Sequence, residues 1–434
     1  MNAVLIRADA GPVIGTGHVM RCLALAGAFQ RAGASPVFAS RQMFPNLASR
    51  IAAGGWRHVA LPPAEGDNSD RAADVPYADW LAAGWREDAD ATVAAAREAG
   101  ADWIVVDHYG IDRAWQSRVR AAGLKVAALD DLADRAHDAD LLVDPSLNAE
   151  PYARYAALLP AGRQRLLGPR YAILRDEFRT KPIRTQRDGL VWLIAFGGVD
   201  QAGMTLRALQ AVATALGPDD RGHIVIGGQN AARPEIEARA AALGLQTHVD
   251  TDRMAALMAS ADLAVGAGGH MLWERAAMAL PSIAVIVAEN QREQVTEAAR
   301  AGVVLKLDGQ RMSDGDLAAA VLALASDPAT RARLATAGRK AVDGQGAARI
   351  VRRIAGPPIS IRPAEDADCA PMHAWRNDPR VRGGSTNSGA FDFDTHRVWF
   401  DRVQADPDRD LLVGEAPDGP LGVVRFDRRG AEAE

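Results

Sequence analysis

The segment VLIRADAGPVIGTGHVMRCLALAGAF, residues 4–29, determines the fold that we expect for the first half of the chain. Its apolar start predicts a short strand, and the apolar spacing from Cys22 onward predicts a helix. Between them, Gly15 and Gly17 permit a sharp turn and direct backbone amides toward a ligand above the helix start. A strand, a glycine turn and a helix in this order predict an α/β domain with an anion site at the turn.

His18 follows these glycines at the carboxyl end of the expected strand, where open α/β sheets place their ligands. We interpret it as the best candidate for a general base, because the ordinary pKa of imidazole is near neutrality. The alternative is a histidine at a helix start that bonds nearby backbone, and residues 15–21 alone favour neither interpretation. The dinucleotide-binding pattern G-x-G-x-x-G is not met, because Met20 occupies the place of its third glycine.

The composition is that of a globular protein with two or three domains, at 434 residues with 48% hydrophobic and 24% charged residues. A net charge of −5 argues against a general surface for nucleic acid or anionic membranes. The two cysteines, Cys22 and Cys369, are far apart, which disfavours a disulfide scaffold or a zinc site and fits the reducing cytoplasm. No signal peptide or apolar run of membrane length is evident. We therefore expect a cytoplasmic protein without a metal or cofactor.

Strand and helix patterns alternate through residues 1–150 and again through residues 188–355. Such alternation is typical of parallel sheets with helices on both faces, so we expect two Rossmann-like domains. Residues 151–187, rich in Pro, Arg and Tyr, interrupt the alternation and are expected to form a bridge. Two joined domains leave a cleft, which is a preferred ligand site. After the sequence GPP at 356–358, a third segment covers residues 359–434.

The expected strands follow from short apolar runs. They span residues 4–8, 36–40, 103–108, 125–129 and 141–143 in the first half, and 190–196, 223–226, 247–249, 263–265, 283–287 and 303–307 in the second.

Two further glycine turns follow strands in the second half. Gly197 and Gly198 end one strand, and Gly268 and Gly269 end another, so both turns can offer amides to a diphosphate. Singly, each is more often a tight turn than a ligand site, but three such turns favour a nucleotide held across the cleft. Glu274 lies about one helical turn further on and is expected to accept the ribose hydroxyls; the alternative is favourable charge near a helix start.

Other candidate site residues follow strands near His18. Asp107 is expected to orient an imidazole, or else to be a buried cap, and Tyr109 offers a phenol to the sugar or the attacking water. Asp9 and Arg21 flank the base and are expected to fix its tautomer. Asp9 is counted with the catalytic residues, and Arg21 with those expected to bind the substrate.

Three further polar positions complete the candidate set. His108 is expected to point away, because adjacent strand residues face opposite sides. Asp130 and Asp131 are interpreted as a turn rather than a metal pair. Asn290 and Gln291 are candidates for the acetamido groups of a sugar, with Asn290 as a helix N-cap as the alternative.

Several of these motifs together resemble one family of enzymes. They are RAD at 7–9, IGTGHVMR at 14–21, VDHY at 106–109, LDD at 129–131, DPSLN at 144–148, and GAGGHMLWE at 266–274. In this order they resemble the UDP-2,4-diacetamido-2,4,6-trideoxy-β-L-altropyranose hydrolases of pseudaminic acid biosynthesis, over roughly residues 1–355.

The resemblance implies two facing Rossmann-like domains of glycosyltransferase-B (GT-B) type. It also implies release of UDP from a UDP-sugar by inverting attack of water at the anomeric carbon, without a metal, with His18 as base. One departure is that His270 and Met271 replace the family's small hydroxyl residues, so side-chain help to the diphosphate is missing unless His270 supplies it. A glycosyltransferase and a non-catalytic nucleotide-sugar binding protein are the alternatives.

The third segment resembles the first part of a GNAT-type N-acetyltransferase, through IRPAEDAD at 361–368, WRND at 375–378 and HRVWF at 396–400. Such enzymes hold the pyrophosphate of acetyl-CoA on an Arg/Gln-x-x-Gly-x-Gly/Ala loop before a helix. RFDRRG at 425–430 does not supply this loop. We therefore expect neither acetyl-CoA binding nor acetyl transfer by this chain.

Overall fold

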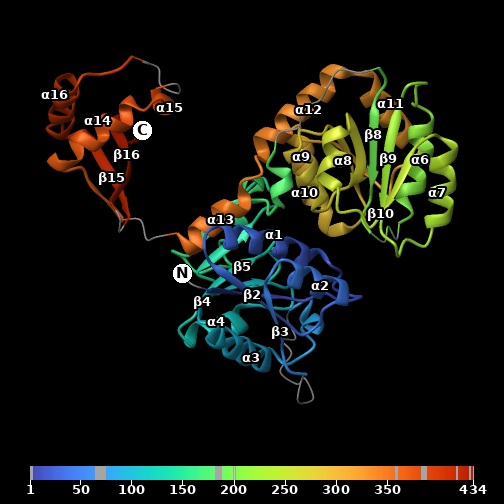
Figure 1. Cartoon of the computed structure of the whole chain (residues 1–434), viewed down its shortest axis with the longest axis horizontal. Coiled ribbons are helices and arrows are strands. Elements are labelled where there is room, and N and C mark those ends of the chain that lie inside the picture. Colours follow the sequence, from blue (N-terminus) through green and yellow to red (C-terminus); the bar gives the residue numbers. More distant parts are fainter. Residues whose placement is uncertain are drawn as a thin grey trace. The chain divides into compact units, whose positions relative to one another are not determined.

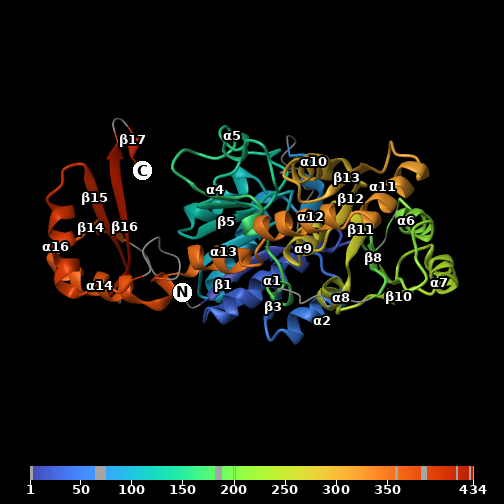
Figure 2. The ribbon, with the colours of Figure 1, turned by 90° about the horizontal axis from the view of Figure 1, so that it is seen from above.

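The computed structural model of the chain describes residues 3–63, 75–180, 188–198, 200, 202–356, 360–382, 389–416, 419–429 and 432–433. It divides into two compact units, Met1–Ala355 and Gly356–Glu434, whose elements are drawn in Figures 1 and 2.

The first sheet of the larger unit has seven parallel strands in the order β3-β2-β1-β4-β5-β6-β7. They are β1 (Ala3–Ala8), β2 (Ser35–Ser40), β3 (Arg57–Ala60), β4 (Ala101–Asp107), β5 (Lys125–Leu129), β6 (Leu141–Asp144) and β7 (Gln164–Leu167). The helices are α1 (Gly17–Arg31), α2 (Pro45–Ala53), α3 (Trp85–Glu98), α4 (Arg113–Ala121) and α5 (Pro151–Arg154), with a 3-10 turn η1 (Ala78–Leu81).

Both faces of this sheet are covered, so its central strands are largely apolar. In β1, Val4 and Ile6 pack into one hydrophobic cluster, whereas Ala3 and Leu5 pack into the cluster on the opposite face. This alternation follows from the two-residue period of a strand. It explains why residues 3–6 are continuously hydrophobic.

The second sheet has six parallel strands in the order β10-β9-β8-β11-β12-β13. They are β8 (Val191–Ala195), β9 (Arg221–Ile226), β10 (Gln246–Val249), β11 (Leu263–Ala267), β12 (Ser282–Ile286) and β13 (Leu305–Asp308). The helices are α6 (Met204–Ala213), α7 (Arg233–Ala242), α8 (Met254–Ser260), α9 (Met271–Ala277), α10 (Arg292–Arg300), α11 (Asp314–Ser326) and α12 (Pro328–Ala341), with a 3-10 turn η4 (Glu289–Gln291). Helices lie on both faces of this sheet (Figure 1).

The expected boundary at residue 150 is wrong, because the first sheet continues into the segment that we expected to be a bridge. Strand β7 pairs with β6, from Gln164 against Leu141 to Leu167 against Asp144. The connection between the two sheets is made by later residues, where neighbouring side chains pack into different hydrophobic cores. Ile173 packs into the core beneath the first sheet, whereas Leu174 packs into the core of the second.

The end of the second domain also differs from the expectation. Helix α13 (Gly346–Ala355) returns to the first half and packs against α1. Figures 1 and 2 both show the orange α13 beside the blue α1. Ile350 and Val351 are buried in one cluster with Val19 and Leu25 of α1, so this helix completes the first domain's core.

All eleven expected strands of the two sheets are present, with ends that differ by at most two residues. The sequence analysis missed β3 and β7, which lie at the two edges of the first sheet. Their sequences, RHVA and QRLL, mix polar with apolar residues because an edge strand is only partly covered.

The smaller unit has an antiparallel sheet in the order β14-β15-β16-β17. Its elements are β14 (Ser360–Pro363), α14 (Cys369–Asn377), α15 (Pro379–Arg382), α16 (Phe393–Gln404), β15 (Arg409–Ala416), β16 (Gly419–Arg429) and β17 (Glu432–Ala433). Its core is small: Cys369, Met372, Phe400, Val403 and Leu411 form one cluster. Ile359, at which we expected this segment to begin, lies outside the described residues.

Among the described residues, we find no helix that combines the length and the apolar character needed to cross a membrane.

Candidate functional site

A cavity of about 320 Å³ opens within the larger unit, between the turns that follow its two sheets. Residues of both halves line it: Ile14, Gly17, His18, Arg21, Trp80, Tyr109, Asp131, Leu132, Pro145, Ser146, Arg154, Gly269, His270, Trp273, Asn290, Gln291, Glu293 and Gln294. Eight of these are predicted site residues, namely Gly17, His18, Arg21, Tyr109, Gly269, His270, Asn290 and Gln291.

His18 enters this cavity from the first turn of α1 and is held by a carboxylate behind it. Its Nδ1 atom lies 2.6 Å from Oδ1 of Asp107, the buried last residue of β4. An ionised carboxylate accepts only, so Nδ1 carries the proton and donates it to this bond. When Nδ1 carries the proton of the neutral ring, the lone pair is on Nε2, which is the tautomer that a general base needs.

Asp107 stays ionised because cationic groups surround it. Arg21 donates from Nη2 to Oδ1 at 2.6 Å and from Nε to Oδ2. Burial alone would raise the pKa of Asp107, but the charge of Arg21 and the hydrogen bonds from Arg21 and His18 outweigh burial and hold this pKa well below its ordinary value. Arg21 also donates to Asp131 at 2.9 Å, so its guanidinium joins two carboxylates. Arg21 lines the cavity, and its contact with a substrate stays a prediction.

Tyr109 packs edge-on against the imidazole of His18, with 4.5 Å between ring centroids. Its hydroxyl donates a 2.6 Å hydrogen bond to Asp131. Burial, and then the nearby carboxylate, raise the pKa of Tyr109 well above its ordinary value, so the phenol stays protonated. Asp131 is thus a wall of the cavity, and interpreting it as a turn residue alone is wrong. Its neighbour Asp130 does form a turn, by accepting from the amides of Leu132 and Ala133.

Asp9 does not take the predicted place beside the base. It accepts two hydrogen bonds from Arg7, at 2.7 and 2.9 Å, and one from the amide of Arg41 at 2.7 Å. Nε2 of the buried His108 lies 3.4 Å from Oδ2 of Asp9. Asp9 is fully buried and is absent from the lining, so its prediction as a catalytic group is wrong. His108 points away from the cavity, as expected from its position beside Asp107.

Gly15 shapes the turn before His18 and does not offer its amide to a ligand. This amide donates to the carbonyl of Gly11 at 2.7 Å, and the backbone of Gly15 has a φ of 78°. A side chain at this φ would be strained, which explains the residue type. Gly17, by contrast, begins α1 and lines the cavity.

The first glycine turn of the second half lies outside the cavity lining. The carbonyl of Gly198 accepts from the amide of Gly227 at 3.0 Å, and the backbones of the two residues approach closely. Gly197 has a φ of 95°, which glycine adopts without strain. The structure therefore explains Gly197 and Gly198 by turn geometry and close packing, which is the alternative that the sequence left open.

The second glycine turn divides into a structural and an exposed part. The amide of Gly268 donates to Val285 at 3.0 Å, so the prediction that it binds substrate is wrong for this group. Among the described residues, nothing accepts from the amides of Gly269 and His270. Nε2 of His270 donates to the carbonyl of Ile173 at 3.0 Å, and burial lowers the pKa of this imidazole to about 4. The neutral ring has no second N–H, so its side chain cannot replace the family's hydroxyl as a donor.

Glu274 is buried in α9 beside Trp273 but is not part of the lining. Among the described residues, no hydrogen bond reaches its carboxylate. Burial raises the pKa of Glu274 to about 7, against the opposing charges of Arg175 and Arg275. Its expected contact with a ribose stays a prediction.

Asn290 and Gln291 lie in η4, at the start of α10, and both line the cavity. The N-cap of α10 is Gln291, which makes no side-chain cap bond, so the alternative of Asn290 as N-cap is wrong. Oε1 of Gln291 accepts a hydrogen bond from the amide of Val287 at 3.2 Å, so the NH₂ group of Gln291 points away from this amide.

Ten lining residues were not among the predicted site residues: Ile14, Trp80, Asp131, Leu132, Pro145, Ser146, Arg154, Trp273, Glu293 and Gln294. Arg154 binds the carbonyls of Asp131 and Leu132 and lies 3.5 Å from Glu293 of the other half. The motif DPSLN at 144–148 is one of those that carry the family resemblance, and it precedes α5. This position was the signal in the sequence that could have identified lining residues in this region.

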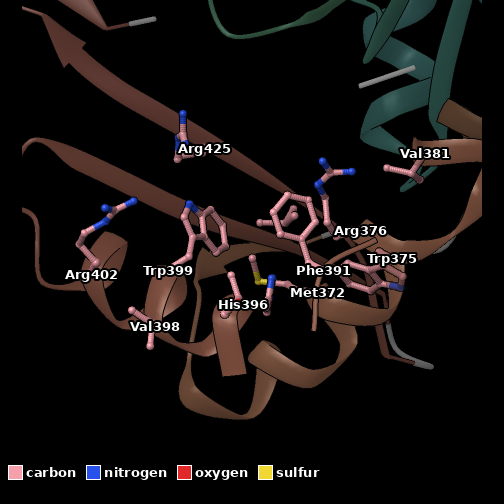
Figure 3. Close-up of a pocket in the computed structure, with 12 residues that line it drawn as sticks. Met372, Trp375, Arg376, Val381, Phe391, His396, Val398, Trp399, Arg402 and Arg425 are labelled. Carbon is pink, nitrogen blue, oxygen red and sulfur yellow. The ribbon is translucent and has the colours of Figure 1, made fainter. Parts of the chain in front are cut away.

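A second cavity, of about 620 Å³, lies in the smaller unit. The rings of Trp375, Phe391 and Trp399 form its walls, with Arg376 and Arg402 at its rim (Figure 3). In the part of the chain that the structure describes, no group of three or more His, Cys, Asp or Glu residues is placed to hold a metal ion.

Residues 223–353 match the model of the glycosyltransferase family 28 C-terminal domain. Spore coat polysaccharide biosynthesis protein SpsG of Bacillus subtilis (strain 168) is 28% identical over 191 residues, which cover 42% of this chain and 56% of that protein. UDP-2,4-diacetamido-2,4,6-trideoxy-β-L-altropyranose hydrolase of Campylobacter jejuni is 24% identical over 208 residues, covering 47% of this chain and 63% of that protein. The chain thus spans less than two thirds of the length of these curated relatives.

The crystal structure of Acinetobacter baumannii MurG superposes with a TM-score of 0.56 at 15% identity, over 81% of this chain and 99% of that chain. This likeness confirms the expected fold. The two parallel sheets form two Rossmann-like domains of the GT-B fold, and the second carries the sequence features of the glycosyltransferase family 28 C-terminal domain.

Proposed function

We propose that this protein is a hydrolase that releases UDP from a UDP-linked 2,4-diacetamido-2,4,6-trideoxy sugar, with inversion at the anomeric carbon. The observation that carries the proposal is the imidazole of His18, anchored at Nδ1 by a buried carboxylate and lining a cavity between two Rossmann-like domains. The relative from Campylobacter jejuni, named for this reaction, supports the choice of substrate.

In the proposed reaction, His18 activates the water. Its Nε2 takes a proton as the water oxygen bonds the anomeric carbon from the face opposite the diphosphate. The bond from this carbon to the diphosphate oxygen breaks, and its electron pair leaves with UDP. The transition state resembles an oxocarbenium ion, and a positioned base contributes about 10²–10⁴-fold to the rate. Asp107 is a positioning residue, because it fixes the tautomer and stabilises the imidazolium that forms.

UDP is a good leaving group, so no acid is required on the leaving side. The amides of Gly269 and His270 donate hydrogen bonds to the diphosphate and stabilise the negative charge that develops on it. Tyr109, bonded to Asp131, presents its ring and a phenolic oxygen to the sugar or the water. We assign Asn290 and Gln291 to the acetamido groups, since primary amides both donate and accept.

Glycosyl transfer to an alcohol is the second candidate function, and the match to the glycosyltransferase family 28 C-terminal domain favours it. The two reactions share the nucleotide site and differ in what occupies the position next to His18. A GT-B fold hosts either chemistry, so only the reaction itself distinguishes them.

Incubation of the purified protein with the UDP-sugar in ¹⁸O-labelled water, without an acceptor, tests the proposal. Hydrolysis at the anomeric carbon places the label in the sugar. Label in UDP would mean attack at phosphorus. Release that requires an added alcohol would favour the transferase, and binding without turnover would favour a non-catalytic binding protein.

A further inference from the structure

A buried arginine lies beneath the glycine turn that borders the cavity. Arg275 belongs to α9, is 1% exposed, and donates from Nη2 to the carbonyl of Ala267 at 2.8 Å. Ala267 ends β11 and precedes by two residues Gly269, which lines the cavity. The guanidinium therefore lies directly behind the turn.

The charge of Arg275 is poorly compensated. Among the described residues, its Nε and Nη1 atoms have no hydrogen-bond partner and no carboxylate forms an ion pair with it. Burial lowers the pKa of Arg275 to about 10, with the neighbouring Glu274 opposing the change, so the group is cationic at neutral pH. A buried charge without a partner destabilises a fold, and its presence at such a position needs another explanation.

The backbone is built to accommodate this side chain. A Cβ atom at Gly266 would overlap the carbonyl oxygen of Ala195 and lie 2.7 Å from Nη1 of Arg275. Glycine at position 266 thus leaves room for the guanidinium between β8, β11 and α9. In the same turn, the amides of Gly269 and His270 lack acceptors among the described residues.

We propose that Arg275 supplies, from behind the turn, the positive charge that attracts the diphosphate of UDP to the amides of Gly269 and His270. Arg275 is a positioning residue: it does not touch the nucleotide, and it acts through a protein interior where a charge is weakly screened. The inference rests on the proposed function, because it assumes UDP in this cavity. A ligand without phosphates gains nothing from this charge.

Calorimetric titration of the full-length protein with UDP and with uridine tests the proposal. Arg275→Gln keeps a donor for the Ala267 carbonyl but removes the charge, and we expect it to weaken UDP binding by about tenfold. Uridine binding should change less than twofold. The control Arg275→Lys keeps the charge and should retain UDP affinity within about threefold of the wild type. The melting temperature of ligand-free Arg275→Gln should equal or exceed that of the wild type, because a buried charge is removed.

Equal weakening of UDP and uridine in Arg275→Gln would show that the residue only supports the fold, and unchanged UDP affinity would show that its charge is not used. Arg275→Met serves for the same comparison if Arg275→Gln does not fold, and failure of both to fold would also overturn the inference. A wild-type protein that binds neither ligand contradicts the proposed function itself. A wild type that binds UDP, with Arg275→Gln unchanged, contradicts only the role of Arg275.

Discussion

His18 and Asp107 are 89 positions apart in the sequence, yet Nδ1 of one lies 2.6 Å from Oδ1 of the other. The register of the first sheet produces this pairing, because Ala8 at the end of β1 lies opposite Asp107 at the end of β4. The chain turns after β1 and enters α1 directly above the end of β4. Parallel neighbours end at the same edge of a sheet, so the imidazole and its carboxylate meet there.

Replacing His18 with Ala should reduce UDP release by about 10²–10⁴-fold while changing the Kd for UDP less than threefold. The imidazole acts on the water rather than on the nucleotide, so the rate and the affinity separate. Steady-state kinetics and calorimetry measure the two quantities. His223→Ala, a half-buried histidine on β9, is the control and should keep normal turnover. A His18→Ala protein with normal rates would show that His18 is not the base.

Asp107→Asn should lower kcat by about 100-fold or more, with a smaller change in KM, because Asn does not hold the proton on Nδ1 of His18. It also removes a buried partner of Arg21, so thermal unfolding should occur at a lower temperature. Asp90→Asn, which breaks an exposed ion pair with Arg118, is the matched control. It should lower the free energy of unfolding by less than about 1 kcal/mol.

The same carboxylate contributes to the acid dependence of stability. The pKa of Asp107 is lower in the folded than in the unfolded protein, so its contribution is present above about pH 4 and is lost as the pH falls below it. Asp107→Asn should therefore lose less stability than the wild type on acidification. Urea unfolding between pH 3 and pH 6 measures this, and parallel curves for the two proteins would contradict it.

Glu274 should give the opposite pH dependence. The pKa of Glu274 is about 7 in the folded protein, against an ordinary value of 4.5. Between these two pH values, the folded protein keeps a proton on Glu274 that the unfolded chain releases. Stability is then greatest at low pH and falls by up to about 3 kcal/mol as the pH rises through 7. Glu274→Gln cannot ionise and should lack this loss, which urea midpoints from pH 5 to pH 8 will show. If Glu274 accepts ribose hydroxyls, uridine binding should strengthen over the same range in the wild type only.

Gly268→Ala should destabilise the protein by about 1–3 kcal/mol, because its Cβ would overlap Cγ2 of Val295. Val295→Ala in the same chain should restore part of the loss by making room for the methyl group. Gly269→Ala is the control for folding, since its nearest neighbouring atom, Nε2 of Gln291, is 3.6 Å away. Equal melting temperatures for the two alanine variants would contradict the different roles of these adjacent glycines.

A chain that ends at Ala355 should release UDP at the full-length rate, because every residue of the proposed site lies in the larger unit. The full chain should not transfer an acetyl group from acetyl-CoA. A radiolabelled acetyl assay with the full chain and kinetics of the shortened chain check the two statements. Loss of hydrolysis on shortening would mean that residues 356–434 contribute to the reaction.

The sequence was sufficient for the sheets because their strands are buried on both faces. A run such as Val191–Ala195 is apolar throughout and has few other interpretations. Edge strands β3 and β7 lack this pattern and were missed. The return of α13 to α1 also has no local signal, since its strongly amphipathic sequence states only that one face is covered and not by what.

Site residues were predictable where a single motif contains the chemistry, as for His18 and its glycine turn. They were not predictable where the role depends on a partner distant in sequence. Asp9 and Asp107 end adjacent parallel strands or follow them closely, and only the structure shows that one pairs with Arg7 and the other with His18. Likewise, no pattern distinguishes Gly268, whose amide is used, from Gly269, whose amide is not.

The position of α13 has a consequence for dividing this protein into fragments. Cutting the gene between the two sheets would separate Ile350 and Val351 from the surface of α1 that they cover. The N-terminal fragment would then expose an apolar surface on α1, and the C-terminal fragment would end in an amphipathic helix with no surface to pack against. Each fragment should aggregate when it is produced alone, and the two should reassemble when they are produced together. The two halves therefore unfold as one cooperative unit although they contain two sheets.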